Sequence, residues 1–297
     1  MPARPQTVGE WLEWAVRAYA RKKVALGQVA DNAHDEALYL LLRTLELPLE
    51  SPRSVLRRKL TPAQTEKVAE VFRRRLDERV PAAYLTREAF LGGHRFYVDE
   101  RVIIPRSYFV ELLAEQIPAW LPAGKPVKRV VDVCTGSGCL AVLLAERFPD
   151  AKVDAIELSP DAAAVARFNF AQHELGARIT LHRSDVFDAV PPAKYDLILS
   201  NPPYVPTREL RGLPEEFKRE PAMALDGGGD GLDIVRKLLR QARERLQPHG
   251  VVTLEVGQAA PALDRAFREL DPHWLQTEDG DNCVCVITAA RLKTWNG

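Results

Sequence analysis

Hydrophobic positions in the first third of the chain recur at helical spacing. Three segments show this pattern: one from Thr7 onward, one from about Ala33 to Leu45, and one from Pro62 to Leu76. Apolar side chains three and four residues apart share one face of a helix, so each segment predicts an amphipathic helix. Thr61-Pro62 adds an N-cap and a favoured first helical residue. The pattern therefore predicts a helical domain over residues 1–85.

The pattern changes beyond Pro81 to short apolar runs. Residues 89–98 carry apolar side chains on both sides of Gly92-Gly93, which is typical of a β-hairpin. Residues 101–104 form a second strand-like run that ends at Pro105. We expect residues 86–107 to be a connecting hairpin, followed by a helix from about Tyr108 to Trp120.

Strand-like and helix-like segments alternate from residue 129 onward. The predicted strands are 129–134, 152–157, 179–182, 195–200, 251–256, 275–277 and 284–288; the predicted helices are 139–148, 160–173, 231–246 and 260–270. This alternation predicts an α/β domain over residues 108–297, with a twisted, mostly parallel seven-stranded sheet and helices on both faces.

Bulk composition excludes several classes of protein. The chain has 297 residues, of which 46% are hydrophobic and 28% charged, and its net charge is zero. These values are typical of a soluble globular protein without a general bias toward nucleic acid or membranes. No apolar run has the length of a signal peptide or membrane span, so we expect a cytoplasmic protein. Neither the four cysteines nor the six histidines have metal-ligand spacing, so no metal is expected and the thiols should be buried and reduced.

The helical block is mildly basic. Up to Thr86 it contains 15 Lys and Arg against 11 Asp and Glu, a difference of +4. Most of this excess comes from Arg57, Arg58, Lys59, Arg73, Arg74 and Arg75. We expect these residues to form solvated helix faces, with a polyanionic partner as the alternative.

The stretch Asn201-Pro202-Pro203-Tyr204 directly follows the predicted strand 195–200. Two prolines cannot donate to a sheet ladder, so the strand has to end there. In open α/β sheets the carboxyl ends of strands are where ligands bind. The tetrapeptide is therefore a stiff acceptor of hydrogen bonds, suited to a flat ligand group, although a plain turn also fits.

A second group of residues suggests a cofactor site. Asp132 begins the turn Asp132-Val133-Cys134-Thr135-Gly136-Ser137-Gly138, and Glu157 ends the next predicted strand, 19 residues after Gly138. Such glycines let a ligand approach the backbone, and such an acid accepts from a ribose diol. A nicotinamide site shares this pattern. Asp132 could face the cationic end of S-adenosylmethionine, and Asp185 could accept from an adenine amino group or simply serve a turn.

Together these motifs resemble the class I S-adenosylmethionine-dependent methyltransferases, which implies a Rossmann-like fold. The tetrapeptide is similar to that of enzymes that methylate planar amino groups: adenine, cytosine or the glutamine amide. The resemblance implies catalysis by Asn201, Pro202 and Tyr204, with the first two accepting the hydrogens of the nitrogen and Tyr204 stacking on the flat group. It implies S-adenosylmethionine as the cofactor, bound by Asp132, Thr135, Gly136, Gly138, Glu157, Asp185 and Asn201.

Two further stretches narrow the resemblance to the protein-glutamine methyltransferases. Their connector hairpin resembles Phe90-Leu91-Gly92-Gly93-His94-Arg95-Phe96-Tyr97-Val98 followed by Val102-Ile103-Ile104-Pro105-Arg106. Their substrate loop resembles Arg219-Glu220-Pro221-Ala222-Met223-Ala224-Leu225. With the helical block, the match covers nearly the whole chain. It implies that the substrate is bound by Asn201, Pro202, Pro203, Tyr204, Arg106 and Glu220.

The residues after Arg106 separate two branches of that family. In the release-factor branch another proline and acidic residues follow this arginine, whereas Ser107-Tyr108-Phe109 follow it here. Leu213-Pro214-Glu215-Glu216-Phe217 is also closer to the branch that methylates large-subunit ribosomal protein three. The resemblance thus implies this ribosomal protein as the partner and substrate, with the GGQ motif of release factors as the alternative.

Three other classes remain open on the sequence alone. A nucleic-acid amino-methyltransferase shares the tetrapeptide, but zero net charge and a small helical block disfavour a phosphate-binding surface. A nicotinamide oxidoreductase would not need the tetrapeptide. A binding module without catalysis would not need Asp132, Glu157, Asp185 and Asn201 together.

Overall fold

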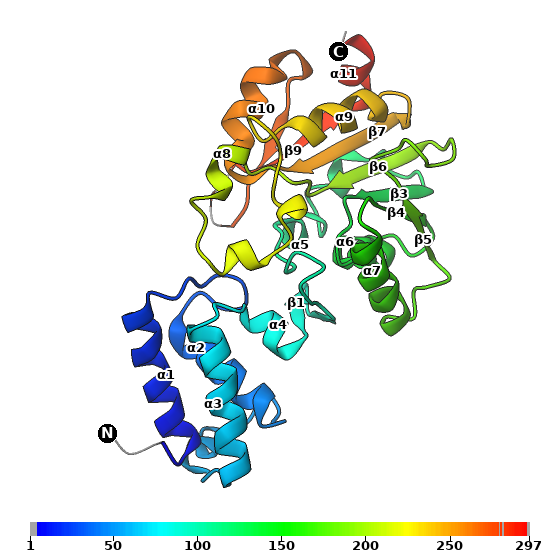
Figure 1. Ribbon diagram of the computed structural model, residues 1–297. Helices are drawn as coiled ribbons and strands as arrows, with labels where there is room; N and C mark the ends of the chain where they lie inside the picture. The colour runs from blue at the N-terminus through cyan, green and yellow to red at the C-terminus, as the bar shows by residue number, and fades with distance from the viewer. Residues whose placement is uncertain (1–4, 279, 281, 296–297) are drawn as a thin grey trace. The chain divides into compact units, whose positions relative to one another are not determined.

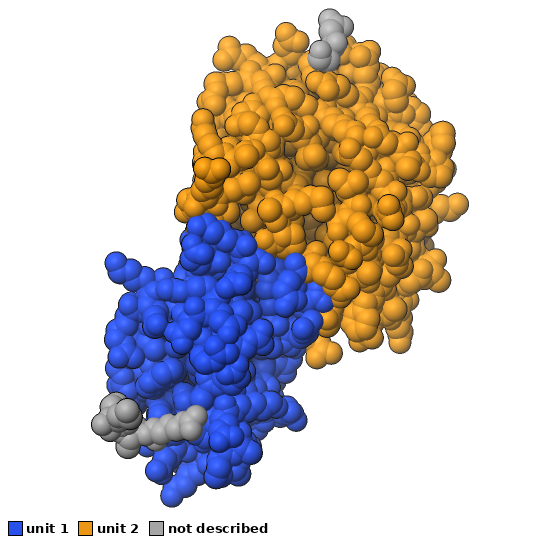
Figure 2. Space-filling view, viewed as in Figure 1, with its two compact units in different colours: residues 1–89, 98–100, 214–219 blue, residues 90–97, 101–213, 220–297 orange. Residues whose placement is uncertain are grey.

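The computed structural model describes residues 5–278, 280 and 282–295. The chain divides into two compact units (Figure 2). The helical unit comprises residues 1–89, 98–100 and 214–219; the sheet unit comprises residues 90–97, 101–213 and 220–297. Both units are discontinuous along the chain, and the domain boundaries at residues 85 and 107 stay a prediction.

Three long helices form the helical unit: α1 (Val8–Lys22), α2 (Ala33–Thr44) and α3 (Pro62–Leu76), with the shorter η1 (Arg53–Arg57) and α4 (Ala82–Thr86). Thr7 and Thr61 each close a capping box, and Pro62 occupies the first turn of α3. The core contains Trp11 stacked on Phe72, with ring centroids 6.2 Å apart. The three predicted helices are confirmed.

Seven strands form the sheet of the sheet unit (Figure 1). They are β3 (Arg129–Val133), β4 (Lys152–Glu157), β5 (Ile179–Arg183), β6 (Tyr195–Ser200), β7 (Leu246–Glu255), β8 (His273–Leu275) and β9 (Val284–Thr288). Their order is β5-β4-β3-β6-β7-β9-β8; β9 pairs antiparallel with both β7 and β8, and the other pairs are parallel. The predicted α/β class with a mostly parallel seven-stranded sheet is confirmed.

The two faces of this sheet belong to separate hydrophobic cores. Val130 and Leu197 face the core that includes α6 (Cys139–Arg147) and α7 (Pro160–Gln172). Their sequence neighbours Val131 and Ile198 face the core of α9 (Asp233–Ala242), α10 (Ala260–Ala266) and α11 (Ala289–Thr294). Figure 1 shows α6 and α7 on one side of the sheet and α9 on the other. Because both faces of the sheet are buried, the strand sequences are continuous apolar runs.

The connecting segment differs in part from the prediction. The hairpin of β1 (Ala89–Leu91) and β2 (His94–Phe96) is confirmed. The strand expected at 101–104 was wrong: these residues form no strand, and the Ile104 amide donates to the Glu220 carboxylate instead of a ladder. The helix expected at 108–120 is reduced to α5 (Phe109–Leu112) and η2 (Pro118–Trp120), because the Ile117 amide donates to the Leu112 carbonyl instead of the Leu113 carbonyl, and Pro118 has no amide hydrogen to donate.

The remaining elements are short turns of helix: α8 (Thr207–Leu210), η3 (Phe217–Arg219), η4 (Ala222–Ala224), η5 (Gly257–Ala259) and η6 (Arg268–Leu270). Among the described residues, no helix combines the length and the apolar character needed to cross a bilayer. Cys139, Cys283 and Cys285 are buried and Cys134 is partly buried.

One residue of the basic helical block is not on the surface. Arg57, Arg58, Lys59 and Arg73 are exposed, as expected. The prediction was wrong for Arg75, whose side chain is 0% exposed and forms an ion pair with Glu36. Burial is possible there because the charge of the guanidinium is neutralised by a carboxylate that is itself buried.

Candidate active site

The strand order reverses direction between β3 and β6. The chain goes from β3 outward to β4 and β5, then returns to the other side of β3 as β6. In open α/β sheets, ligands bind outside the carboxyl ends of the strands at such a switch point. Val133 and Ser200, near the ends of the two strands, are paired in register, and the Ser200 hydroxyl donates to the Val133 carbonyl at 2.6 Å. The glycine turn and the tetrapeptide therefore leave the sheet side by side.

Asp132 lies in β3 and is completely buried. Its Oδ2 accepts a hydrogen bond from the Thr135 hydroxyl, while its Oδ1 has no hydrogen-bond partner. Burial raises the pKa of Asp132 to about 7, against the opposing effect of the Thr135 hydroxyl and the Ala141 amide. A buried acceptor without a donor is uncommon in proteins and suggests that a bound group supplies the donor.

The glycine turn is joined to Glu157 at the end of β4. The Gly136 amide donates to one Glu157 oxygen at 2.9 Å, and the Ser159 amide donates to the other at 2.8 Å. Burial raises the pKa of Glu157, and these backbone amides oppose that shift. Gly138 has φ +84°, and a Cβ there would lie 2.5 Å from the Phe170 ring. Only glycine fits this position, so the turn stays close to α7.

Asp185 is a partly exposed member of the predicted cofactor residues. It follows β5, its side chain is 44% exposed, and it forms an ion pair with Lys237 at 2.6 Å. The neighbouring Ser184 amide donates to the Glu157 carbonyl at 3.0 Å, which places the Asp185 backbone next to the end of β4. The side chain retains capacity for another donor because a carboxylate accepts several hydrogen bonds.

Two acceptors lie beside the side-chain amide of Asn201. Its Nδ2 is 3.5 Å from the Arg106 carbonyl, and it also donates to the Glu255 carboxylate. Because both neighbours accept, the NH₂ group of Asn201 faces them and Oδ1 remains available for a ligand. Glu255 in turn accepts from the Ser107 hydroxyl at 2.5 Å and from the Tyr108 amide at 3.2 Å. This network fixes the orientation of the Asn201 amide.

The rest of the tetrapeptide is packed against glycines. Pro202 is buried, and Pro203 and Tyr204 are partly buried. A Cβ at Gly257 would lie 2.7 Å from the Tyr204 ring, and a Cβ at Gly231 would lie 2.3 Å from the Tyr204 carbonyl. Burial raises the pKa of Tyr204 above its usual range, with Glu255 adding to the shift. The phenol is therefore neutral at physiological pH.

Arg106 and Glu220, both predicted to bind substrate, form an ion pair with each other. The Arg106 Nη1 lies 2.9 Å from Glu220 Oε1, and Nη2 lies 3.1 Å from Oε2. The Glu220 side chain is 0% exposed, whereas that of Arg106 is 31% exposed. The exposed edge of the guanidinium is thus the part of this pair that a ligand can reach.

Glu255 and Ser107 were not predicted as site residues from the sequence. Glu255 ends β7, a strand that was predicted, and it is the only acid in the run Val251–Val256. An acid at the carboxyl end of an apolar strand was the available signal, as it was for Glu157. Burial raises the pKa of Glu255 to about 7, and its hydrogen bonds oppose the shift.

A matched domain model indicates the class of protein. Residues 110–235 match the family model of the methyltransferase small domain. The chain also resembles the solved hMettl16 catalytic domain, in complex with a 3'UTR hairpin, with a TM-score of 0.51 and 14% identity over 78% of this chain and 84% of that chain. At 14% identity, the similarity to the hMettl16 domain concerns the fold alone. The protein is a methyltransferase.

Curated relatives define the family. The chain is 45% identical to the ribosomal protein uL3 glutamine methyltransferase of Burkholderia pseudomallei, over 98% of this chain and 97% of that protein. It is 44% identical to that of Neisseria gonorrhoeae, over 96% of this chain and 95% of that protein. The chain belongs to the family of ribosomal protein uL3 glutamine methyltransferases. The resemblance to protein-glutamine methyltransferases, and to their ribosomal-protein branch, is confirmed.

Proposed function

We propose that this protein transfers a methyl group from S-adenosylmethionine to the side-chain amide nitrogen of a glutamine in ribosomal protein uL3. The observation that carries the proposal is the position of Asn201-Pro202-Pro203-Tyr204. It leaves β6 at the switch point of the sheet, next to the glycine turn that follows β3. Identity of 44–45% to relatives of this activity supports the same assignment.

The residues around the glycine turn fit S-adenosylmethionine. The partnerless Oδ1 of Asp132 would accept from the cationic end of its methionine part. Glu157 would accept from the ribose hydroxyls, since each of its oxygens binds one backbone amide and can accept further. We propose that Thr135, Gly136 and Gly138 shape this part of the site and that Asp185 accepts from the adenine amino group. When bound, the cofactor supplies an electrophilic methyl group on a sulfonium.

The tetrapeptide would hold the glutamine amide for attack. Conjugation makes an amide nitrogen a poor nucleophile. We propose that Asn201 Oδ1 and the Pro202 carbonyl accept its two hydrogens, which fixes the lone pair toward the methyl group and favours the pyramidal transition state. On accepting the methyl group, the nitrogen would release one proton to water. Tyr204 would stack on the amide and exclude water from it.

Residues outside the tetrapeptide would recognise the protein substrate. We propose that the helical segment 1–85 recognises the protein, with 86–107 as connector and 108–297 as the methyltransferase domain. The exposed edge of Arg106 would contact the substrate, and the buried Glu220 would contribute by orienting Arg106. A ribosomal protein substrate implies a reaction in the cytoplasm, without direct methylation of nucleic acid. No metal takes part in this scheme.

Methylation assays with radiolabelled S-adenosylmethionine test this function. Purified uL3, peptide chain release factors and ribosomal RNA are offered separately, and mass spectrometry locates the methyl group. We expect label on a glutamine of uL3. Label in release factors alone would support the alternative substrate, and label in RNA alone would contradict the glutamine assignment.

A variant tests the role of the tetrapeptide. Asn201→Ala removes an acceptor used in the transition state, so kcat should fall by about a hundredfold or more. Binding of S-adenosylhomocysteine, measured by calorimetry, should change little. Unchanged turnover in Asn201→Ala would contradict the proposed mechanism.

A further inference from the structure

The loop after the tetrapeptide enters the helical unit. Residues 205–213 belong to the sheet unit, 214–219 to the helical unit, and Glu220 onward again to the sheet unit. Near its start and end the loop is closed on itself, because Val205 and Gly227 donate to the carbonyls of Leu225 and Val205, each at 2.9 Å. The middle of this loop is therefore held by contacts in a different compact unit from its two ends.

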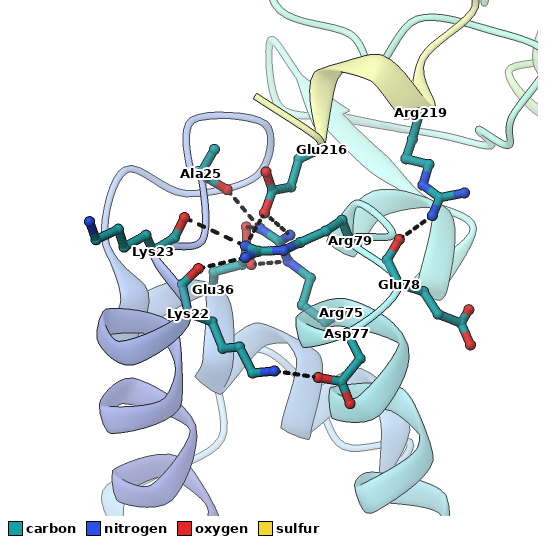
Figure 3. Close-up of polar contacts among 10 residues, drawn as sticks. All are labelled: Lys22, Lys23, Ala25, Glu36, Arg75, Asp77, Glu78, Arg79, Glu216 and Arg219. Atoms are coloured by element: carbon teal, nitrogen blue, oxygen red, sulfur yellow. Dashed lines mark hydrogen bonds and ion pairs between the residues drawn. The ribbon is translucent and has the colours of Figure 1, made fainter. Parts of the chain in front are cut away.

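Glu216 makes the central contact of the segment 214–219. Its side chain is 2% exposed and lies 3.0 Å from Arg79 Nη1 and 3.5 Å from Arg75 Nη1. Figure 3 shows Glu216 directed at both guanidinium groups. Arg79 also donates to the Lys22 carbonyl at 2.5 Å, which ties it to the end of α1. Three segments of the helical unit thus meet at this carboxylate.

Arg75 is prepared for this contact by a second carboxylate. It forms a bidentate ion pair with Glu36, with distances of 2.6 and 3.1 Å, and Nη2 donates to the Ala25 carbonyl at 2.9 Å. Both side chains of that pair are 0% exposed. Glu36 alone cannot neutralise Arg75 and Arg79 together, so the cluster is balanced only when Glu216 is in place. The helical unit therefore has a charged site that fits a loop carboxylate.

A second contact holds the other end of the segment. The Arg219 guanidinium donates to the Glu78 carbonyl in the helical unit. The next residue, Glu220, accepts from Arg106 and from the Ile104 amide in the sheet unit. Two buried carboxylates four residues apart in the sequence are thus fixed in different units. One of them orients the predicted substrate arginine.

We propose that Glu216 is a positioning residue: its ion pairs with Arg75 and Arg79 anchor the loop that follows the tetrapeptide, and so preorganise this loop for the protein substrate. The inference rests on the proposed function for its effect on methylation. Without the anchor, the loop has to be ordered when the substrate binds, which raises KM and leaves cofactor binding unchanged.

Hydrogen exchange of Glu216→Gln tests the anchor independently of any substrate. The matched control is Glu215→Gln, because Glu215 is 66% exposed and forms its ion pair with Lys218. We expect the amides of residues 217–219 to exchange about tenfold faster in Glu216→Gln, with α1 and α2 unchanged, and no acceleration in the control. Unchanged exchange at 217–219 would overturn the proposal.

Kinetics with uL3 test the consequence for catalysis. We expect the KM for uL3 to rise about tenfold in Glu216→Gln, with kcat and the Kd for S-adenosylmethionine within about twofold of wild type. A KM equal to that of the control would overturn the positioning role. If wild type does not methylate uL3 at all, the proposed function fails while the exchange result still decides on the anchor.

A second variant covers the case in which Glu216→Gln loosens the whole helical unit. Arg79→Gln leaves the buried Arg75–Glu36 pair intact and removes the 3.0 Å contact to Glu216. It should accelerate exchange at 217–219 and at the end of α1, where Arg79 donates to the Lys22 carbonyl, without accelerating exchange in the rest of the helical unit. Acceleration throughout the helical unit in both variants would show that the cluster only stabilises the fold, and would overturn the proposal.

Discussion

Glu255 is a buried carboxyl group, and its burial disfavours the ionised form. Burial raises its pKa from 4.5 to about 7, although four hydrogen-bond donors, among them Ser107 and Asn201, favour the charged form. The folded state thus binds a proton more tightly than the unfolded state between these two values. Stability contributed by this group is therefore present at low pH and is lost as the pH rises toward about 7.

Replacing Glu255 by glutamine should remove this pH dependence. We expect the difference in the free energy of unfolding between wild type and Glu255→Gln to fall by about 1–3 kcal/mol as the pH rises from 4.5 to 7.5, and to stay constant above that. Urea denaturation at several pH values measures it. The pKa of Asp132 is also raised, but Asp132 is present in both proteins, so its contribution to the pH dependence of stability cancels in the difference. A difference independent of pH would contradict the assignment.

Gly257 is the residue that leaves room for the Tyr204 ring. A Cβ there would lie 2.7 Å from the ring, at a backbone φ of +44°. We therefore expect Gly257→Ala to displace Tyr204 and to lower kcat by about tenfold or more, with a smaller effect on the melting temperature. Gly229→Ala is the control, because nothing lies within 4 Å of a Cβ at that position. Equal activity of the two variants would argue against a role for the ring.

Individual site residues were predictable from the sequence where they belong to a short motif. The local pattern places three of them at the carboxyl edge of the sheet: Asp132 precedes the glycine turn, Glu157 ends a strand, and Asn201 precedes two prolines. Glu255 carried the same strand-end signal as Glu157 but was not predicted, and Arg75 gave no comparable signal. The ion-pair partners of Arg75 are Glu36 and Glu216, which are 39 and 141 residues away in the sequence. Such contacts exist only in the folded chain.

The start of α6 depends on its contact with α7. Gly138 is the N-cap of α6, and a Cβ at this position would lie 2.5 Å from the Phe170 ring and 3.3 Å from the Ala166 backbone. Gly138→Ala should therefore lower the free energy of unfolding by about 1–3 kcal/mol and weaken binding of S-adenosylmethionine. Denaturation and calorimetry measure the two effects. Gly176→Ala, which meets nothing within 4 Å, should leave both unchanged.

Elements were predictable where burial on both faces gives a continuous apolar run. β4, β6 and β9 have the expected bounds, Lys152–Glu157, Tyr195–Ser200 and Val284–Thr288. The prediction was less accurate where tertiary contacts decide. α9 ends at Ala242, before the expected residue 246, because Leu246 already pairs with Tyr195 as the first residue of β7. Pairing with a distant strand overrides the local helical pattern there.

The two compact units have separate hydrophobic cores. Phe72 is 1% exposed and packs with Trp11, Trp14 and Tyr19 of the helical unit. Phe72→Ala should therefore destabilise that unit by about 3–5 kcal/mol. Because the proposed cofactor residues lie in the sheet unit, the Kd for S-adenosylmethionine should stay the same while methylation of uL3 falls. Loss of cofactor binding in parallel would show that the units do not fold independently.

A control for this variant comes from the surface of the sheet unit. Phe168 is 49% exposed, so Phe168→Ala should change the free energy of unfolding by less than about 1 kcal/mol. Differential scanning calorimetry compares the two variants.

The division into two units was the feature least predictable from the sequence, because the segment 214–219 lies more than a hundred residues beyond the rest of its unit.

The proline after Asn201 also affects how long the enzyme lasts. Asparagine usually deamidates when the amide nitrogen of the following residue attacks its side chain and closes a succinimide ring. Pro202 has no N–H, so its nitrogen cannot close that ring. Deamidation would place a carboxylate beside Glu255 and the Arg106 carbonyl, where only a donor fits. The same proline that ends the strand thus protects the Asn201 side chain from spontaneous deamidation.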